Sequence, residues 1–137
     1  MDEESIILLG LNPLQEELDY ISSIDSVEEY SAALWHYTSE VPIAHFFRFF
    51  ASANPEDSNQ MIAALWQSGL GLPDSAYYFA EEEIYEQVRN SYVEYIAQLF
   101  VLAGDSEEDA QANAAIVYDI EHRLAEVSND ALQNQDP

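Results

Sequence analysis

The sequence predicts a mainly α fold: a helical bundle with a long antiparallel helix pair and one short β-hairpin. Apolar residues recur at spacings of three and four through residues 81–102 and again after Ser106, which predicts the two long helices. Turn-forming residues separate two short apolar runs, 43–51 and 61–67, which predicts the hairpin. With 137 residues, 48% of them hydrophobic, the chain has the size of one domain, or of a part of one, spanning 1–137.

Two helices are expected near the N-terminus. Residues 2–9 form the end of the first, with acids at its start and Gly10 as its stop. The second begins at Asn12, which can cap it, with Pro13 in the first turn and Gln15 completing a capping box. The apolar stripe of this helix consists of Leu14, Leu18 and Ile21.

A third helix is predicted after Ser26, because Ser26 and Glu29 have the spacing of a second capping box. Val41-Pro42 ends this helix, since a residue before proline disfavours helical geometry. Its apolar positions are Val27, Tyr30, Leu34 and Tyr37.

The hairpin region is rich in aromatic residues. Phe46, Phe47, Phe49 and Phe50 surround Arg48 in the first run, and residues 52–60 have the composition of a loop. Periodicity alone leaves a helix open for this region. Aromatic residues and arginine anchor interfaces, so Phe47, Arg48 and Phe49 are candidates for facing a substrate or a partner. Packing in the core is the alternative.

Two long helices follow. The first begins after three glutamates that suit a helix N-terminus, and Gly104 ends it. Ser106, with Asp109, caps the second. Residues 130–137 form a polar tail that is expected to fray. The expected inner faces consist of Ile84, Val88, Tyr92, Ile96 and Leu99 in the first helix and of Ala110, Ala114, Val117, Ile120, Leu124 and Val127 in the second.

The charge is strongly negative. The chain carries 27 acids against three arginines and has no lysine, for a formal net charge of −24. Such a surface disfavours nucleic acid and anionic membranes as partners. Three origins are open: a salt-adapted or marine source, deliberate surface design, or a functional acidic patch.

No apolar run reaches the length of a membrane span, and residues 6–9 are too short for a signal-peptide core. The chain has no cysteine, so the redox state of its compartment stays open.

No catalytic metal motif is present in the sequence. None of His36, His45 and His122 begins the HExxH pattern, in which two histidines on one helical turn bind zinc beside a general-base glutamate. Asp119, His122 and Glu126 share one helical face and form a weaker metal pattern, for which a plain solvated face is the alternative. We therefore predict no metal and no catalytic residue in this chain. An Asp119–Arg123 surface pair is expected at i, i+4.

One turn-rich segment carries the strongest family signal. Residues 67–78 read QSGLGLPDSAYY, with the motif positions Gly69, Gly71, Pro73, Tyr77 and Tyr78. They resemble the GL-LP-x-x-x-YY turn of the zinc metallopeptidases that include neprilysin, endothelin-converting enzyme and the PepO-type endopeptidases. Residues 117–125, with Glu121, resemble the V-x-x-[hydrophobic]-E-x-x-[IL]-A helix of the same family.

The resemblance extends over roughly residues 10–137. Residues 10–14 look like the family's G-x-x-P-L helix entry, residues 46–58 like its strand and following turn, and Asp136-Pro137 like a segment after the Glu121 helix. Basic residues usual in the family are absent: Glu56 replaces lysine, Ser75-Ala76 replaces Arg-Asp, and Gln135 replaces arginine. These departures match the chain-wide loss of cations and put in doubt the ion pairs that the family makes there.

The resemblance implies a role in a larger enzyme. The matching region of the family belongs to a mostly helical, non-catalytic lobe that encloses a cavity together with the catalytic lobe and restricts it to modest-sized peptides. The implied partners are therefore that catalytic lobe and, in the full-length enzyme, peptides. The zinc ligands and the general base would lie beyond residue 137, so zinc is implied for the parent enzyme only. Family members are often extracytoplasmic.

Two further interpretations stay open. The chain could be a free-standing acidic interaction module, whose partner is basic or whose acidic surface binds cations, or a nucleic-acid mimic that occupies basic proteins. A fragment would also expose apolar surface, which predicts self-association through that patch.

Overall fold

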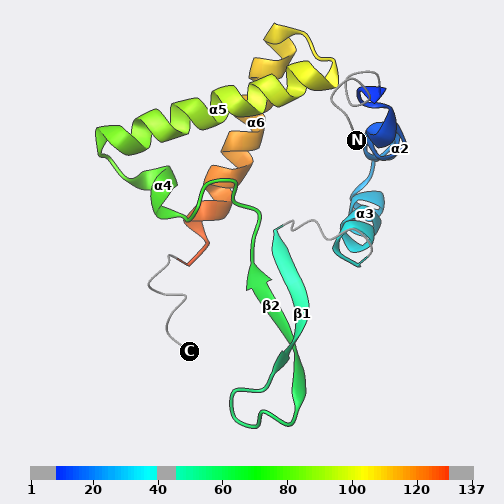
Figure 1. Cartoon of the computed structure of the whole chain (residues 1–137), viewed down its shortest axis with the longest axis vertical. Coiled ribbons are helices and arrows are strands. Elements are labelled where there is room, and N and C mark those ends of the chain that lie inside the picture. The colour runs from blue at the N-terminus through cyan, green and yellow to red at the C-terminus, as the bar shows by residue number, and fades with distance from the viewer. Residues whose placement is uncertain (1–8, 40–45, 130–137) are drawn as a thin grey trace. The chain divides into compact units, whose positions relative to one another are not determined.

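A computed structural model describes residues 9–39 and 46–129 (Figure 1). The chain divides into two compact units, Met1–Ile43 and Ala44–Pro137. The described part is mostly helical with one two-stranded antiparallel sheet, as predicted. The expectation of one domain, or part of one, stays a prediction. Within the described residues no helix has both the length and the apolar character needed to cross a bilayer.

The first unit contains a 3-10 turn and two helices. The turn η1 (Asn12–Leu14) leads into α2 (Gln15–Ser22), and α3 (Val27–Ser39) follows. Gly10 has a φ of 51°, the left-handed conformation typical of a residue that ends a helix. Residues 2–8 of the predicted first helix and the predicted stop at Val41-Pro42 lie outside the described residues.

The predicted start of the second helix is wrong in detail. Leu11 is the N-cap of η1, Leu14 is the N-cap of α2, and neither makes a side-chain capping bond. Asn12 therefore does not cap the helix, and Gln15 bonds forward to Asp19 (2.8 Å) instead of backward. Pro13 makes a tight 3-10 entry favourable, because its fixed φ suits the first turn and its missing N–H is not needed there.

The capping box of α3 is confirmed. The Glu29 N–H donates to Ser26 Oγ (3.2 Å), and the Glu29 carboxylate accepts from the Asp25 N–H (3.0 Å). The bond from the Asp25 N–H stabilises the ionised carboxylate and lowers the pKa of Glu29. The Tyr37 hydroxyl, on the same helix, donates to Glu17 Oε2 (2.6 Å), and this bond raises the pKa of Tyr37 to about 12.

The apolar stripes of the first unit are only partly buried. Ala33 and Tyr37 are buried, whereas several positions predicted to face inward are exposed. The exposed positions are Leu14, Ile21, Val27 and Tyr30. Two helices of this length cannot cover each other's apolar faces completely.

The second unit begins with the predicted hairpin. Strands β1 (Phe47–Ala53) and β2 (Met61–Gln67) pair in register from Phe47↔Gln67 to Ala53↔Met61. Turn residues close the loop as expected: Asn54 Oδ1 accepts from the Glu56 N–H (3.0 Å), and Asp57 Oδ1 accepts from the Asn59 N–H (3.1 Å). Nearly all side chains of both strands are exposed, so the predicted alternative of core packing for the phenylalanines is wrong.

Three helices follow the hairpin. The short α4 (Ala76–Phe79), which the sequence did not predict, precedes α5 (Glu83–Ala103) and α6 (Glu107–Glu126). Gly104 ends α5 with a φ of 112°, and the Asp105 N–H returns to the Phe100 carbonyl (3.1 Å). Figure 1 shows α6 doubling back across α5.

The start of α6 confirms the predicted cap. The Asp109 N–H donates to Ser106 Oγ (3.1 Å), and Ser106 Oγ donates to Asp109 Oδ2 (2.6 Å). The side-chain oxygen of Ser106 thereby satisfies an N–H group at the first turn that has no partner within the helix.

The predicted inner faces of the long helices are confirmed in part, since Ile96, Ala110 and Ala114 are buried. Other predicted positions are exposed: Ile84 and Leu99 in α5, Ile120 in α6, and Val127, which follows the last residue of α6. Two clusters form the core of this unit. One centres on Leu72, Tyr78 and Ala125, with Val88, Tyr92 and Tyr118 against it, and the other on Ile96, Ala97 and Ala114, with Val93, Phe100 and Val117 against it.

Candidate functional site

The motif turn links the hairpin to α4. Gly69 has a φ of 94°, a conformation that side chains disfavour, and this positions the chain to leave β2 sharply. Asp74 Oδ1 then accepts from the Ala76 N–H (2.8 Å), and this bond begins α4. Tyr77 and Tyr78 consequently lie on a short helix that immediately follows the turn.

A single carboxylate connects this turn to both long helices. Glu121 on α6 accepts from the Gly71 N–H (3.2 Å), from the Tyr78 hydroxyl (2.7 Å) and from the Tyr92 hydroxyl on α5 (2.9 Å). The Tyr78 hydroxyl also accepts from the Leu72 N–H (3.2 Å). We call Gly71, Tyr78, Tyr92 and Glu121 the Glu121 node. It satisfies one partly buried charge with three donors from separate parts of the chain.

Glycine is required at position 71 because there is no space for a side chain, and not because of its backbone conformation. A side-chain carbon at this position would overlap the Tyr92 hydroxyl and come within 3.2 Å of Glu121 Oε1. The absence of a side chain allows the peptide N–H to approach the carboxylate. Gly69 and Gly71 therefore serve different physical needs within one turn.

Both tyrosines of the node are neutral donors at neutral pH. Burial raises the pKa of Tyr78 and of Tyr92 well above the usual 10, and the hydrogen bonds to Glu121 act in the same direction. A phenol with a raised pKa is a poor nucleophile or base at pH 7, because its reactive anion is scarce. The chemistry of the node is therefore that of a hydrogen-bonded anchor.

Arg89 on α5 supports the other side of the turn. Its guanidinium donates to the carbonyls of Tyr77 and Ala80, both at 2.9 Å, near the end of α4. A cation bound to the last carbonyls of a helix satisfies their missing partners. The Tyr77 ring packs edge-on against Tyr85, with centroids 5.1 Å apart.

A pair of hydrogen bonds joins the hairpin to the segment that follows α6. Gln67 Nε2 donates to the Asn129 carbonyl, and the Asn129 N–H donates to Gln67 Oε1, both at 2.8 Å. Beside them lies a cavity of about 200 Å³. Its lining includes Trp66, Gly69, Pro73, Asp74 and Ser128.

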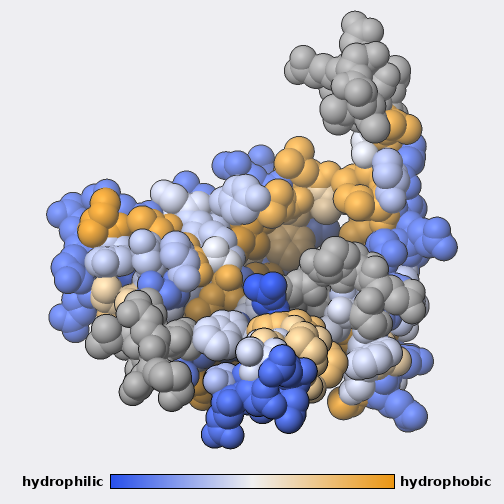
Figure 2. Space-filling view, turned by 60° about the horizontal axis from the view of Figure 1, so that its bottom comes forward, coloured by the Kyte–Doolittle hydropathy of each residue, from blue (hydrophilic) through white to orange (hydrophobic). Residues whose placement is uncertain are grey.

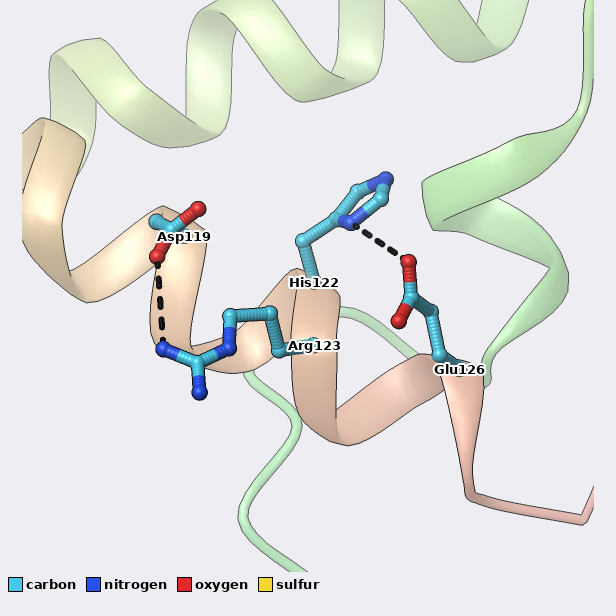
Figure 3. Close-up of polar contacts among 4 residues, drawn as sticks. All are labelled: Asp119, His122, Arg123 and Glu126. Carbon is cyan, nitrogen blue, oxygen red and sulfur yellow. Dashed lines mark ion pairs between the residues drawn. The ribbon is translucent and has the colours of Figure 1, made fainter.

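The weak metal pattern does not form a ligand set. Asp119 pairs with Arg123 (3.9 Å), as predicted, while His122 Nδ1 lies 3.9 Å from Glu126 (Figure 3). The His122 ring also packs edge-on against Phe79 at 4.7 Å. Across residues 9–39 and 46–129, no group of three histidine, aspartate or glutamate side chains is arranged to hold a metal ion. These residues do not fit zinc.

The candidate contact residues lie on β1, away from the node's hydrogen bonds. Phe47 and Phe49 share one face of the hairpin, and Arg48 points to the other, where its guanidinium lies 6.0 Å from the Phe50 ring. Their exposure is compatible with contact to a partner, and that role stays a prediction.

Sequence reasoning missed two members of this region. The sequence predicts Tyr92 only as an apolar side chain of the core, and it predicts no role for Arg89. Arg89 is the only cation in α5, a helix with several acids, and this was the available signal. The hydrogen-bonding role of Tyr92 had no local signal, because its partner lies 29 residues away.

Comparisons with known proteins agree with this geometry. The N-terminal model of Peptidase family M13 matches residues 1–137. Endothelin-converting enzyme 1 of Cavia porcellus is 32% identical over 134 residues, covering 93% of this chain and 18% of that protein. Neprilysin-3 of Drosophila melanogaster is 27% identical, covering 92% and 17%.

A solved structure gives the same result. The zinc metalloprotease Zmp1 of Mycobacterium tuberculosis, in complex with an inhibitor, matches with a TM-score of 0.84 and 29% identity, over 98% of this chain and 20% of that one. The chain thus spans about a fifth of the length of the relatives it matches. It belongs to peptidase family M13 and corresponds to the family's N-terminal region.

Proposed function

We propose that this chain is the non-catalytic helical segment of an M13 zinc metallopeptidase, where it shapes the peptide-binding cavity and limits substrate size. Its partner is the catalytic lobe of that enzyme, which holds the zinc and acts on peptides. The observation that carries the proposal is the Glu121 node. The node fastens the motif turn to α5 and α6, so that three separate segments form one scaffold.

The chemistry of the node supports a scaffold. The Glu121 carboxylate already accepts three hydrogen bonds, and both phenols are held protonated by burial. A rigid wall is what a cavity that selects peptides by size requires, since a wall that yields would admit larger molecules.

The exposed side chains of the long helices favour the proposal that further polypeptide chain packs against them. Large apolar residues on α5 and α6 face solvent, and such surfaces commonly mark places where further chain packs. They include Ile84, Leu99, Leu102, Ile116 and Ile120. The net charge of −24 favours a second candidate, an acidic module that binds a basic protein without enzymatic activity.

A peptidase assay tests the first proposal. We expect no zinc-dependent cleavage by the pure 137-residue chain, because it carries no HExxH, whereas a longer product of the gene should cleave short peptides. In that longer product, Glu121→Ala should loosen the turn and raise cleavage of long peptides relative to short ones. Cleavage by the chain alone that stops with a chelator would sink the proposal. A reading frame that closes at codon 137 would favour the acidic module.

A further inference from the structure

A groove lies between α5 and α6, next to the loop that joins the two helices. Its volume is about 590 Å³, and two of the residues that line it are the buried alanines Ala97 and Ala110, 3% and 0% exposed. Val101 and Leu102 also line it and are 43% and 73% exposed. Because the alanine side chains are short and the other two face solvent, the groove offers room and apolar surface to a large apolar side chain.

The groove is bordered by negative charge. Glu94 on α5 and Glu107 on α6 line it, and none of the lysines, arginines or histidines among the described residues does. Neither carboxylate forms an ion pair within residues 9–39 and 46–129. Figure 2 shows one face of the molecule, where hydrophobic residues likewise lie directly beside hydrophilic ones. An apolar groove with an acidic border is complementary to an apolar side chain with cations on both sides of it.

A second copy of this chain would bring acids to the groove and not cations. The chain has no lysine, and its only arginines are Arg48, Arg89 and Arg123. Arg89 already binds backbone carbonyls at the end of α4, and Arg123 lies 3.9 Å from Asp119. This chain spans about a fifth of the length of the relatives it matches. A longer chain of the family thus has further sequence from which basic residues can come.

The shape of the groove favours a helix as its occupant. Both walls are helices, whose backbone groups bond within each helix, so they offer no free edge to an extended strand. A helix needs none, because it satisfies its own backbone groups, and alanines at the contact let helix axes approach to about 8 Å. The lining residues of α5 run from Glu94 to Leu102, a rise of about 12 Å or two turns.

We propose that the groove between α5 and α6 is the docking site of an amphipathic helix from a later part of the longer chain. A large apolar side chain of that helix lies over Ala97 and Ala110, and its arginine or lysine side chains lie beside Glu94 and Glu107. This inference rests on the proposed function, because it takes the chain to be part of a longer peptidase. It adds which surface of the segment is covered and by what chemistry.

Synthetic peptides test the chemistry of the groove. The probe is a helical peptide of about 18 residues with leucines on one face and lysines beside them, and its match has glutamates in place of the lysines. Fluorescence anisotropy should show that the pure 137-residue chain binds the lysine peptide, more weakly at high salt, and does not bind the glutamate peptide. Equal binding of both peptides, or of neither, overturns the proposal.

Matched variants separate the groove from the general attraction of an acidic chain for cations. Glu107→Gln should weaken binding of the lysine peptide about threefold and Leu102→Ala about tenfold. The controls Glu108→Gln and Leu99→Ala make the same changes at exposed positions outside the groove, and they should leave binding unchanged. Circular dichroism establishes that each variant folds. Equal losses within a matched pair overturn the proposal, since they indicate non-specific attraction.

Thiol labelling tests whether the longer gene product fills the groove itself. Gln98 lines the groove, and the chain has no cysteine of its own, so Gln98→Cys places one reactive thiol there. Maleimide labelling of that site, measured by mass spectrometry and normalised to the unfolded protein, should be at least about tenfold slower in the longer product than in the 137-residue chain. Equal rates overturn this inference even if the longer product cleaves peptides. Slow labelling in a product that cleaves no peptide supports it and contradicts the proposed peptidase role.

Discussion

The carboxylate of Glu121 receives hydrogen bonds from two segments that are distant from it in sequence, the motif segment 67–78 and α5. Its bond to Gly71 joins residues 50 apart and its bond to Tyr78 joins residues 43 apart. A partly buried carboxylate is stable only while its hydrogen-bond donors stay in place. Without them, the free-energy cost of removing the carboxylate from water exceeds the gain from the surrounding packing. Each member of the node is thus sensitive to small changes.

Removal of one hydroxyl should destabilise the second unit. Tyr78→Phe takes a donor from Glu121 and an acceptor from the Leu72 N–H, so we expect a loss of about 2–3 kcal/mol in the free energy of unfolding. Tyr95→Phe, on the exposed side of α5, should change it by less than about 0.5 kcal/mol. Urea unfolding followed by circular dichroism measures both. Equal effects of the two changes would contradict the anchoring role of Tyr78.

At the scale of the elements, local signals placed most boundaries. The caps at Ser26 and Ser106, the stop at Gly104 and the hairpin all act through residues a few positions apart, so they could be predicted. The capping role of Asn12 was wrong, because Pro13 favours a 3-10 entry at that point. Helix starts of similar composition can thus differ in geometry.

The inner face of α6 shows the limit of periodicity. Two series of inward positions can follow Ala114 at helical spacing. One series ends at Ile120, and the other contains Tyr118, Glu121 and Ala125. The hydrophobicity of the residues favours the first series. In the structure the second series faces inward, because the motif turn and Tyr92 supply hydrogen-bond donors for the Glu121 carboxylate. That preference depends on partners outside the helix.

The cap of α6 gives a prediction at this scale. Ser106→Ala removes the oxygen that receives the Asp109 N–H, and we expect the free energy of unfolding to fall by about 1 kcal/mol. The matched change is Ser91→Ala, at an exposed position in the middle of α5. It should leave the free energy of unfolding unchanged or raise it slightly, because alanine favours the helical conformation. Thermal unfolding monitored by circular dichroism distinguishes them. A larger loss from Ser91→Ala would refute the capping argument.

At the scale of the molecule, the net charge of −24 is the dominant electrostatic feature. Three arginines cannot neutralise 27 acids, so the carboxylates of the folded chain repel one another and lower its stability. The structure uses one of these cations, Arg89, to hold backbone carbonyls at the end of α4.

Salt should therefore stabilise the folded chain. We expect the midpoint of thermal unfolding to rise by several degrees between about 0.01 M and 1 M sodium chloride, as the Debye length falls from about 30 to 3 Å. Low protein concentration keeps self-association out of the measurement. Near the isoelectric point the repulsion vanishes, and the same series should show little dependence on salt. An unchanged midpoint at neutral pH would argue against self-repulsion.

The sequence by itself determined the mainly α class, the hairpin, most helix ends and the M13 family, because these depend on neighbouring residues or on an ordered motif. The absence of HExxH could also be read directly from it. Only the tertiary structure decided which members of the predicted stripes of α5 and α6 are buried, why Gly71 has no side chain, and that Glu121 binds two tyrosines. The reason is physical: these features arise where segments 29 to 50 residues apart meet, and the hydrogen bonds that fix them have no counterpart in local sequence.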